Sequence, residues 1–302
     1  MSGSAPKISI VMRSKNSDWV IGHALAGLYS QEFTDFELIV VDSGSTDRTL
    51  DIVRAYPHRL IQIEAASYFP GAVLNMAIEH AQSDLIVFQN SDAVPLTPYT
   101  LGTLVAAFDD PKVQAAFVRQ LPRPDSFSWV LRDYASAFPD SPVPPPWMKM
   151  SLVMSAMRKS IWQRRPFYTD AWASEDTEWS VWAQKNNVKV KYVHDSLVMH
   201  SHNYTNRQIY GRRFVEGEAD AFIYGGHSTL PGMLYRLVRS VAGDWVRQLA
   251  VGDFRDMPFV PARRWVYHWA HHLGHRHGEG RIARGDRDAS VGQKTVLARH
   301  DQ

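Results

Sequence analysis

Apolar runs and amphipathic stretches alternate along the first 120 residues of the chain. Ile8 to Met12 and Phe36 to Val41 are nearly unbroken apolar runs, the pattern of strands that are buried on both faces. The stretch from Trp19 to Leu28 instead carries apolar residues at helical spacing. This alternation predicts an α/β fold with a doubly wound, mostly parallel sheet flanked by helices.

The same criteria predict further elements along the chain. The additional strands are expected at 60–63, 85–88, 113–118, 151–157 and 188–193. The additional helices are expected at 46–56, 71–82, 97–109 and in a stretch that follows 174–176 and ends at 185.

The segment from Arg123 to Trp147 departs from this alternation. It is rich in proline, with Pro142 followed by three consecutive prolines at 144–146. This composition predicts a loop, of the kind that closes over a site or contacts an acceptor.

A second change comes after about Gly225, where the strand and helix alternation ends. Leu230 to Leu249 and Arg263 to Leu273 predict two amphipathic helices. The tail beyond Arg276 is polar, and we expect it to fray.

Composition narrows the class of protein. The formal net charge of +2 gives no field that would select a nucleic acid. The absence of cysteine excludes disulfides and thiolate metal sites. No apolar stretch approaches the roughly 20 residues of a spanning helix, and Met1 to Lys7 has no apolar signal-peptide core. The cytoplasm is therefore the expected location.

Polar residues follow three of the predicted strands. They are Arg13-Ser14-Lys15-Asn16, the run from Asp42 to Asp47, and Asn90-Ser91-Asp92. Because ligands of parallel sheets bind beyond the carboxyl ends of the strands, we expect these three sets to meet at one edge.

The run that begins at Asp42 suits a tight turn beside a ligand. Gly44 permits close approach, and Ser45 or Thr46 can cap the following helix. A helix cap alone would explain Ser45 and Thr46. Asp42 favours a nucleotide site, since a carboxylate at the end of a strand can accept the imide proton of uracil or thymine.

Two acidic sites have chemical and structural interpretations. Asp92 can hold a divalent cation that bridges phosphate oxygens, although Asn-Ser-Asp is also ordinary turn chemistry. Asp176, preceded by Glu175, can act as a general base towards an acceptor hydroxyl, or the pair can simply compensate a helix dipole.

His200 and His202 alternate along an extended segment. Alternate residues of such a segment point to opposite faces. We therefore expect one of the two to face a metal or a diphosphate while the other packs.

Together these residues resemble the family-two inverting glycosyltransferases, which have the GT-A fold. The run Arg13 to Asn16 is similar to the family's opening segment, and FELIVVDSGSTD over 36–47 to its nucleotide-binding strand and turn. Asn90-Ser91-Asp92 lies where the family has its Asp-x-Asp metal motif. Glu175-Asp176 resembles the Glu-Asp base motif, and His200-Ser201-His202 the family's C-terminal histidine.

The resemblance implies an enzyme and its site. It implies transfer of a sugar from a nucleotide-diphosphate donor, dTDP- or UDP-linked, to a hydroxyl of a saccharide or lipid-linked acceptor, with inversion and in cell-surface polysaccharide synthesis. Asp176 would be the base, with Glu175 less favoured, and Asp92, His200 and His202 would hold the metal. The donor would contact Arg13, Asn16, Asp42, Ser43, Gly44, Ser45, Gly71, Asn75, Asn90, Ser91, Asp92 and Arg207.

Two further features refine the resemblance. Residues 118–125 (VRQLPRPD) are similar to rhamnosyltransferase-like members, which points to a dTDP-sugar donor. Asn90 departs from the family, because it replaces the first aspartate of the metal motif. The site then loses a negative charge, so Mg²⁺ or Mn²⁺ would be held mainly by Asp92, or transfer would proceed without metal. Asn90 also supports a rival interpretation, a weakened or inactive sugar-nucleotide-binding scaffold.

The resemblance divides the chain into a GT-A-like catalytic domain over 1–225 and a helical extension over 226–302. Within the first, 1–120 would bind nucleotide and 121–225 the acceptor. The basic and aromatic stretch at 263–274 suits a helix on an anionic membrane, at its inner face, or one docked on the catalytic domain or on a second protomer of a homodimer. The sequence leaves donor sugar, acceptor, linkage and oligomeric state open.

Overall fold

The computed structural model describes residues 6–252 and 254–297, and the chain divides into two units. The first unit extends to Phe167 and resumes at Glu175–His202. The second holds Tyr168–Ser174 and the chain from Asn203 onward. A functional boundary near residue 225 stays a prediction.

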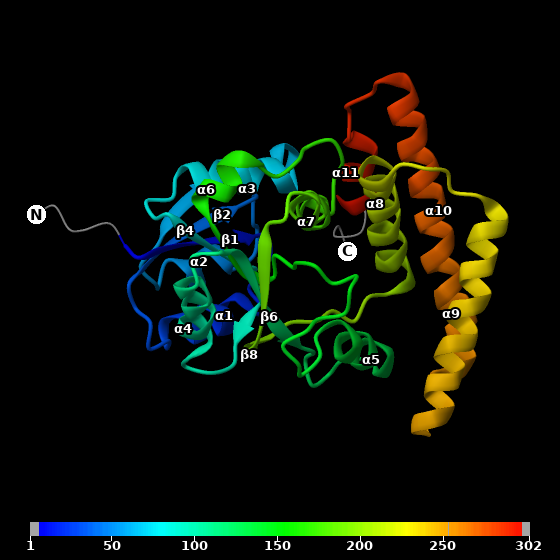
Figure 1. Ribbon diagram of the computed structural model, residues 1–302, viewed down its shortest axis with the longest axis horizontal. Helices are drawn as coiled ribbons and strands as arrows, with labels where there is room; N and C mark the ends of the chain where they lie inside the picture. The colour runs from blue at the N-terminus through cyan, green and yellow to red at the C-terminus, as the bar shows by residue number, and fades with distance from the viewer. Residues whose placement is uncertain (1–5, 253, 298–302) are drawn as a thin grey trace, which may run out of the picture. The chain divides into compact units, whose positions relative to one another are not determined.

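A mixed sheet forms the centre of the first unit (Figure 1). Within the described part of the chain it has eight strands, in the order β3-β2-β1-β4-β7-β6-β8-β5. All of them run in one direction except β7, which is antiparallel to β4 and β6, and β5, which is antiparallel to β8. This confirms the mostly parallel sheet. The strands are β1 (Ile8–Ser14), β2 (Phe36–Asp42), β3 (Arg59–Gln62), β4 (Leu85–Gln89), β5 (Val94–Pro95), β6 (Val113–Leu121), β7 (Met154–Arg158) and β8 (Lys189–Met199).

Helices cover both faces of this sheet, which is why its central strands are apolar throughout (Figure 1). One face packs against α1, α2 and α4, and the other against α3, α6 and α7. Each fully buried aliphatic side chain stabilises the unit by about 1.5–3 kcal/mol. The helices are α1 (Ile21–Tyr29), α2 (Thr49–Val53), α3 (Pro70–Glu79), α4 (Thr100–Ala106), α5 (Ser128–Ala137), α6 (Lys159–Arg164) and α7 (Glu175–Lys185), with short 3₁₀ turns at Ala65–Ser67 and Ala107–Asp109.

Helix α5 corrects the prediction of a loop from Arg123 to Trp147. Val130, Tyr134 and Ala137 lie four and three residues apart, so they share one face of the helix, and Val130 and Ala137 are buried. The prolines that flank this short pattern hid it in the sequence. The proline-rich part at 139–148 remains without regular structure.

The second unit is helical. It contains α8 (Asn206–Tyr224), α9 (Leu230–Val251), α10 (Val260–Arg284) and α11 (Ser290–Leu297), with a 3₁₀ turn at Met257–Phe259. Helix α8 begins with a capping box, in which the Thr205 hydroxyl accepts a hydrogen bond from the Gln208 backbone and the Gln208 side chain accepts one in return. Helix α10 packs on α8 and on α9 and lies between them (Figure 1).

Glycines bring α8 and α10 into backbone contact. A Cβ atom added at Gly274 would lie 1.9 Å from the Phe214 carbonyl oxygen, and one at Gly217 would lie 2.2 Å from that of His271. No side chain larger than hydrogen fits at either position without moving a helix. The glycines therefore set the separation of the two helices.

The C-terminal helices correct the expectation of a frayed tail beyond Arg276. Helix α10 continues to Arg284, and α11 follows it, while residues 298–302 lie outside the described residues. Arg281 is fully buried and its Nη1 lies 2.8 Å from Glu218 Oε1 on α8. The polar sequence predicted exposure to solvent, but the charge of Arg281 is paired with Glu218 inside the unit. None of the helices described combines the length and hydropathy that crossing a bilayer requires.

Candidate active site

The loops that follow β1 and β2 are joined by hydrogen bonds. Ser14 and Asp42 are partners in the parallel register, so both loops leave the sheet at the same edge. The Asn16 side-chain oxygen accepts a hydrogen bond from the Thr46 backbone at 2.9 Å, and the Asn16 backbone donates to the Ser45 hydroxyl at 2.9 Å. Two of the predicted polar sets therefore meet, as expected.

The loop after β4 belongs to the same edge. The Ser17 and Ser91 hydroxyls lie 2.9 Å apart, which connects the first and third polar sets. The Asn90 backbone donates to the Val153 carbonyl at 2.9 Å and so links the loop to the segment that leads into β7.

Asp42 shapes the turn that follows it. It is fully buried, and its Oδ1 accepts hydrogen bonds from the backbones of Gly44 and Ser45 at 3.2 and 2.9 Å, while its Oδ2 accepts one from the Ser45 hydroxyl. Gly44 has φ of +78°, which an L residue adopts only at a cost. Ser43 donates from its backbone to the Ser14 carbonyl at 3.0 Å. These bonds give the turn a defined shape at the end of β2.

Asp92, His200 and His202 form a cluster at the same edge. His202 Nε2 lies 3.1 Å and His200 Nε2 lies 3.7 Å from Asp92 Oδ2. One potential ligand atom from each residue lies within 4.8 Å of the other two. Burial alone would raise the pKa of Asp92, but the hydrogen bond from His202 and the charges of both histidines lower it to about 2. The carboxylate is therefore ionised at any ordinary pH.

The cluster corrects the expectation that only one of the two histidines faces the site. Strand β8 ends at Met199, so the alternation of an extended strand does not apply to His200 and His202. Both rings turn to Asp92, with their centroids 4.9 Å apart in an edge-to-face arrangement.

Two residues that the sequence did not single out hold the His200 ring. Its Nδ1 lies 3.0 Å from Gln120 Oε1 and 3.0 Å from the Tyr134 hydroxyl, and Gln120 Nε2 donates to the Ser151 hydroxyl at 2.8 Å. Because Gln120 Oε1 only accepts, Nδ1 of the neutral ring carries the hydrogen. Nε2 is then the unprotonated nitrogen that a metal requires. Nothing local marks Gln120 or Tyr134, since one is a strand residue and the other lies in the predicted loop.

The donor set of the cluster suits a divalent cation. Two imidazole nitrogens and one carboxylate make a mixed set that first-row divalent cations accept, whereas Mg²⁺ prefers oxygen. The residues present therefore fit a cation such as Mn²⁺.

Glu175 and Asp176 begin α7, as predicted, and differ in their partners. Arg13 Nη1 lies 2.8 Å from Glu175 Oε1, and both side chains are largely buried. Burial and the charge of Glu175 raise the pKa of Asp176 to about 6, against hydrogen bonds from the backbones of Thr177 and Leu152 and the charge of Arg13, which lower it. Asp176 is thus a carboxylate whose pKa lies above its ordinary range.

The base candidate and the cation cluster are joined through one short segment. The Leu152 backbone hydrogen bonds to Asp176, and the next residue, Val153, accepts the hydrogen bond from Asn90. Asp92 follows Asn90 by two residues. The segment of Leu152 and Val153 therefore links the first turn of α7, which holds Asp176, to the loop that holds Asp92.

Three predicted residues lie elsewhere or have other partners. Gly71 is buried in the first turn of α3. The Asn75 amide is held internally: its Oδ1 accepts from Trp162 Nε1 and the Phe167 backbone at 2.9 and 3.0 Å, and its Nδ2 donates to the Phe167 carbonyl at 2.8 Å. Arg207 lies in the first turn of α8, in the second unit.

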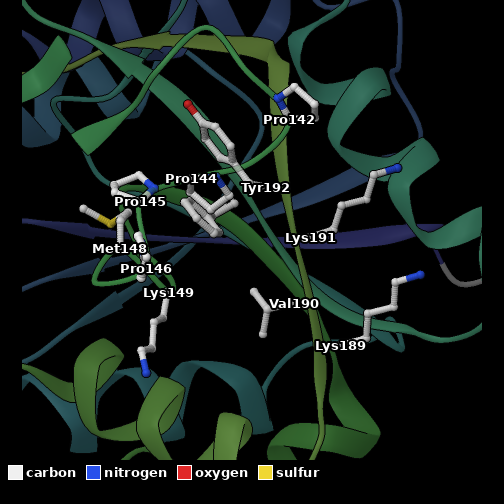
Figure 2. Close-up of a pocket in the computed structure, with 11 residues that line it drawn as sticks. Pro142, Pro144, Pro145, Pro146, Met148, Lys149, Lys189, Val190, Lys191 and Tyr192 are labelled. Atoms are coloured by element: carbon white, nitrogen blue, oxygen red, sulfur yellow. The ribbon is translucent and has the colours of Figure 1, made fainter. Parts of the chain in front are cut away.

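A separate cavity of about 400 Å³ lies beside β8 (Figure 2). Figure 2 places the rings of Pro144 and Pro145 near Tyr192, with Lys191 on the strand beyond. The residues that line it include none of those predicted for the active site. It is therefore distinct from the cation cluster.

The fold and the cation cluster define a glycosyltransferase of the GT-A type. Residues 9–173, more than half of the chain, match the model of glycosyl transferase family 2, and the chain belongs to that family. The matched range contains Asp42 and Asp92 and ends just before Glu175.

Two relatives are O-antigen chain rhamnosyltransferases by name. The chain is 25% identical over 224 residues to the O-antigen chain rhamnosyltransferase RfbN of Salmonella typhimurium, covering 70% of this chain and 71% of that protein. It is 28% identical over 193 residues to the O-antigen chain rhamnosyltransferase WbaN of Salmonella anatum, covering 60% of this chain and 61% of that protein. The resemblance to rhamnosyltransferases is thus confirmed.

Solved structures share the fold. The mannosyltransferase PcManGT of Pyrobaculum calidifontis, in complex with GDP-Man and Mn²⁺, has a TM-score of 0.57 and 19% identity, over 98% of this chain and 80% of its own. TarS 1–349 of S. aureus, in complex with UDP, has a TM-score of 0.56 and 18% identity, over 93% of this chain and 92% of its own. This likeness confirms the α/β GT-A fold.

Proposed function

We propose that this protein transfers a sugar from a dTDP- or UDP-sugar to a hydroxyl of a saccharide or lipid-linked acceptor, with inversion, in the synthesis of a cell-surface polysaccharide. The proposal rests on the hydrogen bonds of Leu152 and Val153. They link Asp176, the candidate general base, to the loop of Asp92, which belongs to the candidate cation site. The names of the two Salmonella relatives favour rhamnose as the sugar, and UDP in the TarS complex keeps uridine open for the base.

The donor would lie along the polar strand ends. We assign the nucleoside base to the turn of Asp42, Ser43, Gly44 and Ser45, beside Arg13 and Asn16. The ribose is assigned to Asn75 or Asp92. Gly71, four residues before Asn75, and Ser91, directly before Asp92, are assigned to the same part of the donor site. Arg207 is retained as a phosphate ligand and Asn90 as an oxygen ligand. The internal bonds of Asn75 favour Asp92 for the ribose and give Asn75 a positioning role.

Asp92, His200 and His202 would hold the divalent cation. A cation there neutralises the charge that develops on the departing diphosphate. Gln120 and Tyr134 fix the ring of His200, so that Nε2 would be presented to the cation without reorganisation. Mn²⁺ suits this donor set better than Mg²⁺.

Asp176 would act as the general base. Its carboxylate removes the proton from the acceptor hydroxyl as the oxygen forms a bond to the anomeric carbon and the bond to the diphosphate oxygen breaks. The electron pair of that bond goes to the diphosphate, and a single displacement inverts the configuration. A pKa of about 6 makes Asp176 a stronger base than an ordinary carboxylate, while Glu175 is engaged by Arg13.

Asn90 favours a second candidate, a weakened sugar-nucleotide-binding scaffold of the same fold. It would bind the donor and turn it over poorly. The cytoplasmic location stays part of the proposal. The homodimer and the membrane contact expected from the sequence are alternative ways to cover the C-terminal helices.

A thermal-shift panel of nucleoside diphosphates with and without Mn²⁺ tests the donor site. We expect dTDP or UDP to raise the melting temperature only when Mn²⁺ is present. Asp176→Asn should keep this stabilisation and reduce transfer by about two orders of magnitude or more, the usual contribution of a general base. Asp51→Asn, an exposed carboxylate paired with Arg54 on α2, is the matched control. Normal transfer in Asp176→Asn would remove Asp176 from this role, and donor binding without any transfer by the wild-type protein would favour the scaffold.

A further inference from the structure

Helix α9 presents an apolar face outward. Val238, Val246 and Tyr235 are 65–67% exposed, far above the value for buried core residues. The apolar positions recur at spacings of three and four, so they lie along one side of the 22-residue helix. The exposed large hydrophobic side chains on α9 are Leu230, Leu234, Tyr235, Val238, Trp245, Val246 and Leu249.

Two polar residues of α9, Asp244 and Gln248, lie on its buried side. Asp244 is 2% exposed and Gln248 fully buried. Asp244 Oδ2 lies 2.6 Å from Arg264 Nε on α10, and Gln248 donates to Asp256 at 3.3 Å. The inward side of α9 therefore combines these polar residues with the fully buried Met233, whereas an ordinary surface helix keeps its large apolar residues inward and few of them outward. The polar contacts hold α9 to the unit and leave its apolar side for something else to cover.

Among the described residues of α9, the exposed charged side chains are all positive. Arg236 and Arg239 are exposed and form no ion pair with an acidic side chain of the described residues. Arg247 pairs with Asp244 at 2.5 Å, and Asp244 is the one acidic residue in α9. The partner that covers this face must therefore carry anionic groups that can pair with these arginines.

The apolar surface continues past the end of the helix. Phe254 and Phe259 are 59% and 65% exposed, and Arg255 lies between them in sequence. Trp245 is 39% exposed and donates from its indole nitrogen to the Met257 carbonyl at 3.1 Å. Aromatic side chains with one polar end are typical of the interface between a bilayer and water.

We propose that α9 lies flat on an anionic phospholipid bilayer. Leu, Val and aromatic side chains would enter the boundary of the acyl chains, while Arg236 and Arg239 pair with lipid phosphates. A second copy fits this face less well. A two-fold pairing of α9 with α9 would bring the arginines of both copies together, with no exposed acidic residue on either helix to neutralise them.

Flotation of the full-length protein with vesicles tests this proposal. We expect binding to vesicles that contain phosphatidylglycerol and weak binding to phosphatidylcholine vesicles. The double variant Arg236→Gln/Arg239→Gln should lower the partition coefficient on anionic vesicles by about tenfold or more. Val238→Ser/Val246→Ser should lower it on both kinds of vesicle. Lys112→Gln/Lys185→Gln, which removes two exposed cations from the first unit, should leave it unchanged within about twofold, since charges away from the membrane contribute little.

Sedimentation velocity without lipid separates the alternatives. A wild-type dimer that Val238→Ser/Val246→Ser converts to a monomer, together with no vesicle binding, would make the face a homodimer interface and overturn the proposal. Equal loss of binding in the lysine control would reduce the effect to net charge and also overturn it. Nucleotide binding of each variant is measured in parallel, so that the result stands whether or not the proposed transfer reaction is correct.

Discussion

The Arg13 guanidinium lies 2.8 Å from the Glu175 carboxylate, and the two residues are 162 positions apart in the chain. Arg13 is the next-to-last residue of β1 and belongs to the first polar set, whereas Glu175 begins α7 directly before Asp176. The ion pair therefore connects the nucleotide side of the sheet to the base candidate. Burial and the charge of Glu175 raise the pKa of Asp176, and the charge of Arg13 lowers it. The balance of these effects leaves the pKa at about 6.

Replacing Arg13 should move the pH dependence of transfer. Asp176 acts as a base only when ionised, so wild-type kcat should rise as the pH passes about 6. Arg13→Gln removes a nearby positive charge, and the pKa of Asp176 then rises further. We expect the acidic limb of the kcat profile to move to higher pH by about one unit. Arg13→Lys, which keeps the charge, should leave the limb near its wild-type position, and an unchanged limb in Arg13→Gln would contradict this coupling.

Asp176→Asn should stabilise the protein while it slows transfer. A carboxyl whose folded-state pKa of about 6 exceeds its ordinary 3.8 costs the folded state free energy once it ionises. Wild-type stability should therefore fall as the pH rises from about 4 to 6, and Asp176→Asn should lack this fall. At pH 7.5 we expect the variant to be more stable by about 3 kcal/mol, and below pH 4 the difference should vanish. Urea unfolding at the two pH values measures this, and a variant that is less stable at pH 7.5 would refute the shifted pKa.

Restoring the acidic motif should strengthen cation binding. Asn90→Asp adds a carboxylate two residues before Asp92, and we expect Mn²⁺ to bind at least about tenfold more tightly in the presence of a nucleoside diphosphate. His202→Ala removes a ligand and should weaken binding by about the same factor or more. Titration calorimetry with Mn²⁺ compares the variants. His194→Ala, at a histidine outside the cluster, is the control.

Gly274→Ala should destabilise the helical unit. The added methyl group would lie 1.9 Å from the Phe214 carbonyl oxygen, so α8 and α10 must separate. We expect a loss of about 2–4 kcal/mol in the free energy of unfolding. Gly280→Ala on the same helix meets only the end of the Arg284 side chain, at 3.2 Å, and should be neutral or stabilising by up to about 1 kcal/mol. Similar losses in both variants would show that helix propensity, not the close approach, decides the result.

Periodicity predicted the elements with strong apolar patterns and missed the short ones. Strands β1, β2 and β4 are buried on both faces, so most of their residues are apolar. A short, nearly unbroken apolar run therefore predicts each of these strands. Strand β5 has two residues and α6 has six, too few for a period to appear. Helix α2 is likewise shorter than expected, since Thr49–Val53 replaces the predicted 46–56.

The candidate site was predicted in its residues and not in its contacts. Strand ends, the turn after Asp42 and the acidic pairs could be read locally, because a parallel sheet places strand ends together. The ring orientation of His200 depends on Gln120 in β6 and Tyr134 in α5. No local pattern relates positions 80 and 66 residues away, so this support had to be found in the structure.

The sequence by itself determined the family, the sheet and the polar strand ends, because each depends on a pattern of residues that are adjacent in the chain. Only the tertiary structure decided that both histidines turn to Asp92, that Arg13 is the partner of Glu175, and that α9 carries its apolar side outward. Each of these depends on which surfaces meet when distant segments pack. The physical reason is that a side chain's charge state and exposure are set by neighbours in space, which hydrophobic periodicity does not encode.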